Sequence, residues 1–519
     1  MCKKEGVTAI ELDYDLKSMQ EMREAVKRSK EAQHRFQEFS QEQVDHIVKN
    51  IAEAAYSKSE WLARLAVEET GMGVIEHKKI KNELGSMGVY ESIKDEKTVG
   101  VIRINHQLKV TEIAYPFGVI AAICPTTNPT STAIFKTLIS LKAQNGIVVS
   151  PHPSAMKCTV EALKICHRAA VEAGAPEGLI GWITRPALAT TTELMKHKDI
   201  DLILATGGGG LVRAAYSSGK PAYGVGPGNG PVYVEKTANV RKAANMIMDS
   251  KTFDNGTLCS TEQAIVVHKN IKEMTVRELK NGGGYFLDSS EKAMLENVIS
   301  PSKGKLNPKI VGRSARIIAE MAGFRVPDET RVLIAEEERI GRDIPLSIEK
   351  LAPIFPLYTA ANDEEAINIC VELLHLGGKG HSCSIHSNDE KAVEKFSLHM
   401  PVSRIMVNTL ASIGAAGATT GLTPSLTLGC GSFGGNISSD NITAHHLLNI
   451  KRVAYGMKEI SIPKPSQPGI LQIEKHSNKN DIHEIVNQVV KETAMKPQAI
   501  DHEEISQIVQ SVIEQYTKM

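Results

Sequence analysis

Four apolar runs that alternate with helical segments limit the folds open to residues 117–206. The runs are F-G-V-I-A-A-I-C-P (117–125), N-G-I-V-V-S-P (145–151), G-L-I-G-W-I-T (178–184) and D-L-I-L-A-T (201–206). Continuous apolar runs bounded by glycine or proline are typical of strands buried on both faces of a parallel sheet. The segments 132–143, 156–173 and 188–197 between them have helical patterns. We therefore expect a doubly wound α/β domain here.

The flanking regions add further elements. Residues 17–95 show apolar side chains at three- and four-residue spacing and are predicted to be helical. The segments 99–106 and 108–116 alternate in strand fashion and predict a ribbon or hairpin. A second α/β region is predicted after the first, with strand-like runs at 231–235, 264–268, 331–335 and 404–408.

Four consecutive glycines, 207–210, follow the last strand-like run of the first region and open a helical segment. Glycines at such a turn let backbone amides and a helix N-terminus approach a phosphate. A glycine run is equally compatible with a plain turn, and no G-x-G-x-x-G pattern is present here. The position on a doubly wound domain favours phosphate binding.

Cys259 lies in the polar stretch K-T-F-D-N-G-T-L-C-S-T-E-Q (251–263), directly before the strand-like run A-I-V-V-H. A free cysteine is most often a small buried hydrophobe. A thiol held in a loop before a buried strand can instead meet a substrate while the strand fixes its position. Cys259 is therefore a candidate nucleophile, and a structural cysteine is the alternative.

Charge and cysteine spacing argue against several classes of function. The 519-residue chain has 60 basic and 60 acidic residues, so no net field favours nucleic acid or an anionic membrane. Its eight cysteines form no C-x-x-C pair and no Cys/His cluster, which argues against a metal site or a disulfide framework. The N-terminus lacks an apolar signal region, and no long apolar run follows it. We expect a cytoplasmic protein and no membrane span.

The last 56 residues or so differ from the body of the chain. Residues 464–480 are rich in Pro, Ser, Lys and Gln, as expected of a solvated linker. Two short amphipathic helices are predicted in 481–519. Their apolar faces are Ile482, Ile485, Val486, Val489 and Val490, and Ile505, Ile508, Val509, Val512 and Ile513. These helices either fold back on the body, cap a subunit interface or dock on another protein.

Ordered motifs along residues 17–462 resemble one family. The stretch F-D-N-G-T-L-C-S-T-E-Q (253–263) is similar to the nucleophile segment of the aldehyde dehydrogenase superfamily, in particular of its coenzyme A-acylating members of the bacterial microcompartment type. The other matching motifs are I-C-P-T-T-N-P-T (123–130), V-V-S-P-H-P-S-A (148–155), A-T-G-G-G (205–209), E-K-L-A-P (349–353), G-K-G-H-S (378–382) and P-S-L-T-L-G-C-G-S-F-G-G-N (424–436). By this resemblance the chain is identified as a member of the superfamily.

The resemblance implies an aldehyde dehydrogenase-like α/β fold with a doubly wound nucleotide-binding domain, an α/β catalytic domain and an oligomerisation hairpin. The expected boundaries are 1–98 with 116–230 for the nicotinamide cofactor-binding domain, 231–449 for the catalytic domain and 99–115 with 450–463 for the hairpin. Relatives of this kind are dimers or tetramers. The resemblance therefore implies a homodimer or a homotetramer.

Individual residues also receive roles from the resemblance. It implies that Cys259 attacks an aldehyde, that hydride passes to the nicotinamide, and that coenzyme A takes the acyl group from the sulfur. It places the Asn128 amide and the Cys259 backbone N–H as donors to the developing oxyanion. His381 either polarises the thiol or coenzyme A or is a structural histidine. Cys430 is assigned no chemistry.

One position is informative because it lacks a catalytic residue that hydrolytic relatives have. Hydrolytic aldehyde dehydrogenases carry a glutamate that activates the deacylating water, and the matching stretch here is V-G-P-G (225–228), with Val225 in its place. Valine cannot accept a proton, whereas the thiolate of coenzyme A needs little help as a nucleophile. The sequence therefore favours acyl transfer to coenzyme A over hydrolysis.

For the cofactor, the resemblance implies a site for NAD. It places Gly207 and Gly208 beneath the pyrophosphate and Glu349 at the nicotinamide ribose. The other expected cofactor-binding residues are Thr126, Ser150, Pro151 and His152. Hydrolytic relatives carry a lysine where Ser150-Pro151-His152 stands here, so NADP stays open as an alternative.

The expected substrate is a small uncharged aldehyde such as acetaldehyde or propionaldehyde, because the loops near Thr257, Leu258 and Leu410 look apolar. Residues 481–519 are similar to encapsulation peptides, so shell proteins of a bacterial microcompartment are expected partners and its interior the expected location. The alternatives are a hydrolytic aldehyde dehydrogenase, an acyl-phosphate reductase on the same fold and a non-catalytic scaffold that presents the tail.

Overall fold

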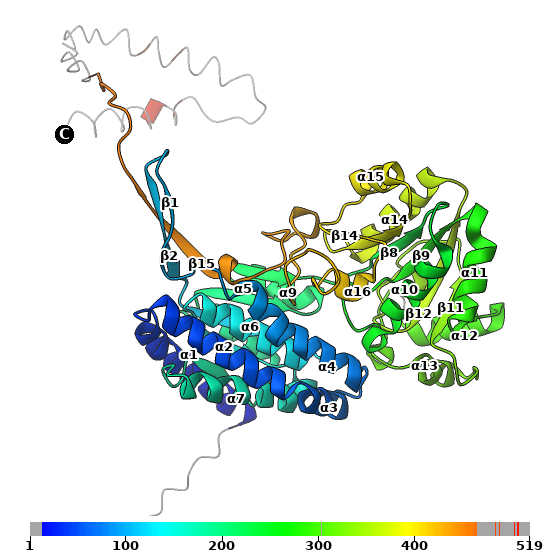
Figure 1. Ribbon diagram of the computed structural model, residues 1–519, viewed down its shortest axis with the longest axis horizontal. Helices are drawn as coiled ribbons and strands as arrows, with labels where there is room; N and C mark the ends of the chain where they lie inside the picture. The colour runs from blue at the N-terminus through cyan, green and yellow to red at the C-terminus, as the bar shows by residue number, and fades with distance from the viewer. Residues whose placement is uncertain are drawn as a thin grey trace, which may run out of the picture. The chain divides into compact units, whose positions relative to one another are not determined.

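The computed structural model describes residues 13–302 and 304–463, together with the single positions 483, 487, 503, 506 and 507. The chain divides into two units, Met1–Tyr455 and Gly456–Met519. Every helix and strand named below belongs to the first unit (Figure 1). In the second unit, residues 456–463 form no helix or strand, and the five single positions are helical. The linker and the apolar faces of the predicted tail helices lie outside the described residues.

Helices precede the first strand, as predicted for residues 17–95. They are α1 (Tyr14–Phe36), α2 (Gln41–Ser57), α3 (Ser59–Thr70), α4 (Ile75–Glu83) and α5 (Val89–Ile93), with the π-helical turn η1 (Leu84–Gly88) before α5. Ser40 starts α2 with a capping box, because its hydroxyl accepts the Gln43 N–H while the Gln43 side chain accepts the Ser40 N–H. The apolar face of α2 is fully buried, which confirms the helical prediction.

The first parallel sheet has the strand order β5-β4-β3-β6-β7. Its strands are β3 (Val119–Ile123), β4 (Gly146–Ser150), β5 (Ile180–Trp182), β6 (Leu202–Thr206) and β7 (Ala222–Val225), and the helices between them are α6 (Pro129–Lys142), α7 (Met156–Glu172), α8 (Leu188–Lys196) and α9 (Gly209–Tyr216). Every residue of β3 and β4 is buried, as expected under helices on both faces. The doubly wound prediction is confirmed. Strand β7 was not predicted, because A-Y-G-V is short and contains glycine.

The strand order fixes where a ligand can bind. Strands β4 and β5 extend the sheet on one side of β3, and β6 and β7 extend it on the other. Strands β3 and β6 are neighbours, and the chain leaves their carboxyl ends toward opposite edges of the sheet. Open α/β sheets bind ligands in the crevice that forms at such a point. The loops that follow β3 and β6 carry Asn128 and Gly207-Gly208.

The second parallel sheet has the order β10-β11-β12-β9-β8-β13-β14. Its strands are β8 (Pro231–Val234), β9 (Ala264–His268), β10 (Gly284–Phe286), β11 (Val332–Glu336), β12 (Ile354–Ala360), β13 (Cys383–His386) and β14 (Ile405–Val407). The helices of this region are α10 (Val240–Thr252), α11 (Lys272–Asn281), α12 (Ser289–Ile299), α13 (Ala315–Ala322), α14 (Asp363–Gly377), α15 (Glu390–His399) and α16 (Ala411–Gly414). The sequence predicted β8, β9, β11 and β14. It missed β12, where Pro356 argues against a central strand, and also the short strands β10 and β13.

A separate antiparallel sheet joins β1 (Gly100–Asn105), β2 (Val110–Pro116) and β15 (Leu448–Ala454), in the order β1-β2-β15. Glu112 of the central strand β2 forms ion pairs with Arg103 of β1 and with Arg452 of β15. Val101, Ile104, Tyr115 and Val453 are at least 42% exposed. This small sheet thus presents apolar side chains to solvent in the single chain.

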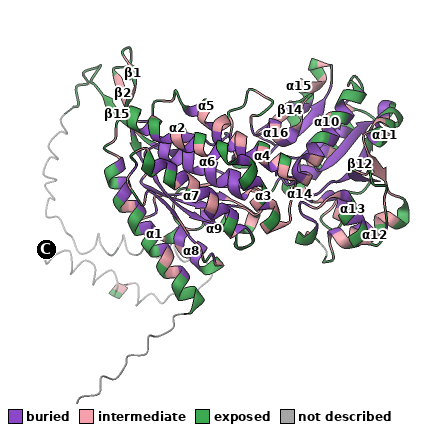
Figure 2. Ribbon diagram, turned by 60° about the horizontal axis from the view of Figure 1, so that its bottom comes forward, coloured by how far each residue is buried: buried purple, intermediate pink, exposed green. Residues whose placement is uncertain are grey.

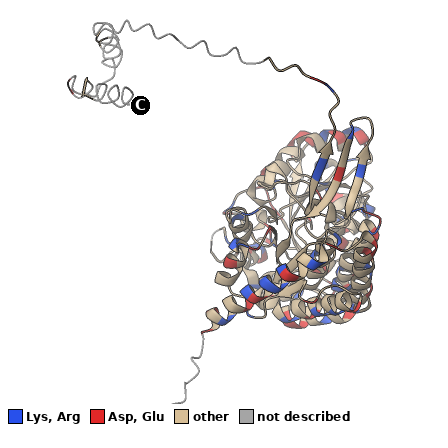
Figure 3. Ribbon diagram, turned by 90° about the vertical axis from the view of Figure 1, so that its left-hand side faces the viewer, with Lys and Arg blue, Asp and Glu red and all other residues tan. Residues whose placement is uncertain are grey.

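The cores lie in and around the two parallel sheets, where Figure 2 shows the buried residues concentrated. In the ribbon of Figure 3, basic and acidic residues are interspersed along the helices, and no large region carries one sign alone. None of the described helices combines the length and apolar composition that crossing a bilayer requires.

Candidate active site

The nucleophile loop begins where α10 ends. Asp254, Asn255 and Gly256 all have positive φ angles, of 50°, 52° and 75°. A left-handed run of this kind is uncommon for residues other than glycine, and it turns the chain sharply before Cys259. Strand β9 starts five residues after Cys259 and is buried throughout. The sharp turn and the buried strand fix the backbone on both sides of the cysteine.

Asp254 holds this turn in place from a fully buried position. Its Oδ1 accepts the Val74 N–H at 2.8 Å. Its Oδ2 accepts from Lys78 Nζ at 2.9 Å, from the Thr257 hydroxyl at 2.6 Å, and from Lys81 Nζ. Burial acts to raise the pKa of Asp254, but Lys81 and Lys78 outweigh it and hold the pKa below its ordinary value. The carboxylate therefore stays ionised in the interior.

A cavity of about 620 Å³ lies at the carboxyl ends of β3 and β6. It is lined by most of the residues that the sequence singled out: Thr126, Asn128, Pro151, His152, Gly207, Gly208, Val225, Cys259 and Glu349. Cys259 comes from the second α/β region and Asn128 from the first, so the cavity joins the two. The fold thus gathers a thiol, an amide and a glycine turn around one space.

Ser150 and His381 are not among the residues that line this cavity. Ser150 is fully buried, and its hydroxyl pairs with that of Thr191 at 2.8 Å. Thr191 does line the cavity, so Ser150 can act on it only through its neighbour. Of the three residues expected beside the aldehyde, Thr257 lines the cavity and Leu258 and Leu410 do not.

His381 is buried behind the cysteine. A Cβ placed on Gly228 would lie 1.9 Å from the Cys259 carbonyl oxygen and 3.4 Å from the His381 ring, so Gly228 separates the two. His381 Nδ1 pairs with the Ser382 hydroxyl at 2.8 Å, and among the described residues no group meets its Nε2. Burial, with the Arg404 charge, lowers the pKa of His381 to about 3. The imidazole is neutral at physiological pH.

The Cys259 thiol is partly exposed to the cavity. Burial raises its pKa to about 12, and the nearby Glu349 and Cys430 act in the same direction. Burial also raises the pKa of Glu349 to about 8, although Glu349 Oε1 accepts the Gly228 N–H at 2.8 Å. Among the described residues that line the cavity, Glu349 is the one carboxylic side chain. At neutral pH it is mostly protonated.

Val225 is 3% exposed and lies in the cavity wall as an apolar side chain. It ends β7, and Gly226 and Pro227 continue the wall toward Cys259. The position that aligned with a catalytic glutamate therefore supplies no base to the cavity.

Comparison with known proteins identifies the fold. Residues 12–282 match the aldehyde dehydrogenase family. This chain belongs to that family. The aldehyde-alcohol dehydrogenase of Clostridium acetobutylicum is 47% identical over 442 residues, which cover 84% of this chain and 51% of that protein. The chain spans about half the length of the aldehyde-alcohol dehydrogenases that it matches. The succinate-semialdehyde dehydrogenase (acetylating) of Clostridium kluyveri is 36% identical, covering 85% of this chain and 97% of that protein.

Solved structures agree with this assignment. An acetylating aldehyde dehydrogenase from Geobacillus thermoglucosidasius matches with a TM-score of 0.86 and 52% identity, over 87% of this chain and 99% of that one. A propionaldehyde dehydrogenase from the Clostridium phytofermentans fucose utilisation bacterial microcompartment has a TM-score of 0.76 and 32% identity, over 84% and 97%. A Rhodopseudomonas palustris propionaldehyde dehydrogenase with bound CoA and an acylated cysteine has a TM-score of 0.75 and 29% identity, over 84% and 97%. The predicted aldehyde dehydrogenase-like fold is confirmed.

An aldehyde dehydrogenase needs a nicotinamide dinucleotide, and the residues of this cavity fit one. A Cβ on Gly208 or Gly226 would meet no atom within 4 Å, so the backbone there is open to a ligand. Gly208 is the N-cap residue of α9 and has no side chain that could accept the first N–H groups of the helix. The first N–H groups of α9 are therefore available to an anionic phosphate.

Sequence analysis missed the buried charges behind the nucleophile loop, which are Lys78, Lys81 and Asp254. In the helix I-E-H-K-K-I-K-N-E the usual pattern is reversed, since Ile80 is 43% exposed while Lys78 and Lys81 are each 2% exposed. Apolar periodicity therefore gives no signal for them. Only the i, i+3 spacing of the two lysines places them on one face.

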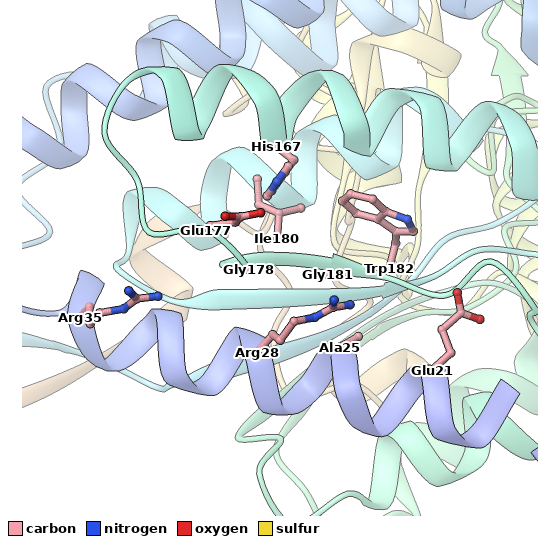
Figure 4. A pocket seen from close by; sticks show the side chains of 10 residues that line it. All are labelled: Glu21, Ala25, Arg28, Arg35, His167, Glu177, Gly178, Ile180, Gly181 and Trp182. Carbon is pink, nitrogen blue, oxygen red and sulfur yellow. The ribbon is translucent and has the colours of Figure 1, made fainter. Parts of the chain in front are cut away.

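A second cavity carries no assigned chemistry. A cavity of about 550 Å³ lies beside the edge strand β5, where Figure 4 shows Arg28 and Arg35 of α1 across from His167 and Trp182. It contains none of the predicted site residues. Within the described part of the chain, no three His, Cys, Asp or Glu side chains are grouped to hold a metal ion.

Proposed function

We propose that this chain is a coenzyme A-acylating aldehyde dehydrogenase, which oxidises a small aldehyde to an acyl-CoA with NAD as the hydride acceptor. One observation carries the proposal: Cys259 and Asn128 share a cavity in which Val225 stands where hydrolysis would need a base. The acetylating relative and the neighbour that contains CoA and an acylated cysteine support the choice of acyl acceptor.

Cys259 is the proposed nucleophile. In the free protein its raised pKa keeps it mainly as a thiol. When the thiol gives its proton to solvent and the sulfur attacks the aldehyde carbon, a C–S bond forms and the carbonyl electron pair moves onto oxygen. Bound NAD would supply the hydride acceptor for that carbon. Cys259 then holds the acyl group on its sulfur as a thioester.

Asn128 and the Cys259 backbone N–H are the proposed donors to the developing oxyanion. One Nδ2 proton of Asn128 is donated to the Thr127 hydroxyl at 3.1 Å, which leaves the other for a ligand. Asn128 lies at the N-terminus of α6, whose dipole also favours negative charge. Loss of one such donor lowers kcat by roughly 100-fold or more in comparable sites.

Release of the acyl group decides between coenzyme A and water. The thiolate of coenzyme A attacks the thioester carbon, the bond to the Cys259 sulfur breaks, and Cys259 takes a proton from solvent. Water needs a base for the same step. Glu349 serves poorly, because it is mostly protonated at neutral pH and one of its oxygens already accepts the Gly228 N–H.

The cofactor would be held by the residues that line the cavity. Gly207, Gly208 and the start of α9 suit the pyrophosphate, and Glu349 suits the ribose next to the nicotinamide. Thr126, Pro151 and His152 are left for the adenosine side. Ser150 supports this wall through Thr191. His381 is retained as a candidate hydrogen-bond acceptor, since a pKa of about 3 makes it a weak base.

The substrate side favours a small uncharged aldehyde. The wall around Thr257 is completed by Met72, Val311 and Leu351, which are apolar. No lysine or arginine is among the described residues that line the cavity. We therefore keep acetaldehyde and propionaldehyde as the proposed substrates.

Assembly and location complete the proposal. The proposed domains are 1–98 with 116–230 for the cofactor, 231–449 for catalysis, and 99–115 with 450–463 for oligomerisation through the exposed apolar faces of β1, β2 and β15. Residues 464–480 are the proposed linker, and 481–519 the segment that binds microcompartment shell proteins in the cytoplasm. A neighbour that comes from a bacterial microcompartment supports this location.

The test monitors the absorbance of reduced nicotinamide as it forms. Acetaldehyde and propionaldehyde are each tried with and without coenzyme A. We expect sustained turnover only with coenzyme A, and none in the Cys259→Ser variant. Equal rates without coenzyme A would mean hydrolysis. If no small aldehyde gives a rate, the non-catalytic scaffold is favoured.

A second experiment tests the tail. Deletion of residues 464–519 should leave the rate of aldehyde oxidation unchanged and abolish binding to shell proteins.

A further inference from the structure

Two lysines of α4 are buried beside the proposed oxyanion site. Lys78 and Lys81 are each 2% exposed and lie one helical turn apart, on the face of α4 that contacts Asp254. Buried lysines are rare unless they are paired, because an ammonium ion loses its hydration. One aspartate faces both lysines, so the cluster keeps one positive charge in excess when all three groups are ionised.

The contacts of Lys81 join two parts of the site that are distant in sequence. Its ammonium group donates to Asn128 Oδ1 at 2.5 Å and to the Thr257 hydroxyl at 3.1 Å, and it pairs with Asp254. Asn128 supplies the proposed oxyanion donor, and Thr257 lies two residues before Cys259. A single side chain thus contacts both the amide and the nucleophile loop, and its three N–H donors are all used.

The contact to Asn128 fixes which way the amide points. An ammonium group can only donate, so the atom of Asn128 that faces Lys81 must be the carbonyl oxygen. The amide nitrogen is then turned to the other side, toward the cavity that Asn128 lines with Cys259. A cation on the amide oxygen also draws electron density from the N–H bonds and strengthens them as donors.

We propose that Lys81 is a positioning residue for the oxyanion site, which holds the Asn128 amide with Nδ2 toward the cavity and ties it to the nucleophile loop through Thr257 and Asp254. This inference rests on the proposed function, because it assigns the amide to the oxyanion. Lys81 acts through Asn128 and touches no reacting atom itself.

The same cluster provides a matched control. Lys78 shares the helix, the burial and the Asp254 partner, but its second contact is the backbone oxygen of Thr127, at 3.0 Å, rather than the Asn128 amide. Replacing either lysine by methionine removes one buried charge and keeps an unbranched side chain that is one atom shorter. The two variants should therefore lose similar stability, and only Lys81→Met should change how the amide is held.

The test is a double-mutant cycle on kcat for aldehyde oxidation with coenzyme A, using Lys81→Met, Asn128→Ala and the double variant. We expect Lys81→Met to lower kcat by roughly 30-fold or more, with the KM for aldehyde changed less than about threefold, and to have less than about a threefold further effect once Asn128 is alanine. Lys78→Met should lower kcat by less than about threefold. Melting temperatures of all variants report whether each one folds.

Three outcomes would overturn the inference. In the first, Lys81→Met leaves kcat unchanged. In the second, the fold-decrease in kcat of the double variant is the product of those of Lys81→Met and Asn128→Ala. In the third, Lys78→Met lowers kcat as much as Lys81→Met does. Each would give Lys81 a structural role only. Failure of the proposed function is separate, because it would appear as an unmodified protein without coenzyme A-dependent turnover. If Lys81→Met does not fold, Lys81→Arg replaces it, and a fall in kcat of at least tenfold is then expected because a longer, planar donor cannot keep all three contacts.

Discussion

Asp201 and Asp254 accept the same kind of backbone hydrogen bond in two regions of the molecule whose surroundings differ. Each accepts the N–H of a valine that follows a glycine of positive φ: Asp201 from Val119 and Asp254 from Val74, both at 2.8 Å. Asp201 directly precedes β6 and bonds the first residue of β3, and it pairs with Lys30 at 3.2 Å. The side chains of Asp201 and Lys30 are 31% and 28% exposed. Asp254 lies behind the nucleophile loop and pairs with two lysines that are almost completely buried.

The two ion pairs differ in burial, and we infer that they differ in role. The exposed pair of Asp201 stabilises the fold alone, whereas the buried pairs of Asp254 also hold the nucleophile loop in position. A partly exposed pair is screened by water, so its partners can move at little cost. A buried pair has no water to replace a lost partner, so its geometry is strict. We infer that the nucleophile loop is rigid because its charges are buried, whereas the start of β3 needs no such support.

The largest contrast is expected when each aspartate becomes asparagine. Asp254→Asn leaves two buried lysines without a counter-charge and should lower the free energy of unfolding by about 3–5 kcal/mol. It should also lower kcat by roughly 100-fold, since Thr257 and Lys81 lose their common partner. Asp201→Asn should cost about 1 kcal/mol and leave kcat unchanged. Denaturant unfolding and steady-state kinetics give both numbers, and equal losses in the two variants would contradict the comparison.

Glycine substitutions test the same two regions from the backbone side. A Cβ on Gly73 would lie 2.0 Å from Asp254 Oδ1, and one on Gly118 would lie 2.1 Å from Asp201 Oδ2. Both glycines have positive φ, so alanine adds about 1–2 kcal/mol of backbone strain in each case. Gly73→Ala should in addition displace Asp254 and lower kcat about tenfold, while Gly118→Ala should not change kcat. A fall in kcat for both variants would remove the distinction.

Acid pH should diminish the contribution of Asp254. Burial acts to raise its pKa, but Lys81 and Lys78 hold the folded-state pKa below the ordinary value. A depressed folded-state pKa adds stability that is fully present above the unfolded value of about 4 and is lost as pH falls through the folded-state pKa. The difference in unfolding free energy between the unmodified protein and Asp254→Asn should shrink as pH falls below about 4. A difference that grows in acid would reverse the assignment.

The smallest effect is expected at Lys30. Lys30→Met should lower the free energy of unfolding by about 0.5 kcal/mol, because both partners are partly exposed. Most of that loss should disappear in 1 M salt, where the Debye length is about 3 Å. Chemical denaturation with urea at low and high salt measures it. A loss of several kcal/mol would show that this pair is as important to the structure as the buried cluster.

Patterning predicted the doubly wound sheet because β3, β4 and β6 are continuous apolar runs between helices. It missed β12, which contains Pro356, and β7, which is four residues long, because pairing with neighbours rather than local composition stabilises them. Cys259 and the glycine turn at Gly207 were candidates from their positions beside strand-like runs, and motif resemblance gave them their roles. Asn128 and Glu349 were found through motif resemblance alone. Lys78, Lys81 and Asp254 were not found at all, because only the fold brings α4 to the nucleophile loop.

The central claim is that the acyl group on Cys259 is passed to a thiol and not to water. A rapid-mixing experiment with enzyme, NAD and propionaldehyde, without coenzyme A, tests this most directly. We predict a burst of reduced nicotinamide no larger than one equivalent per Cys259, a propionyl group on that cysteine by mass spectrometry, and resumed turnover when coenzyme A is added. Steady formation of reduced nicotinamide and free propionate without coenzyme A would contradict the account.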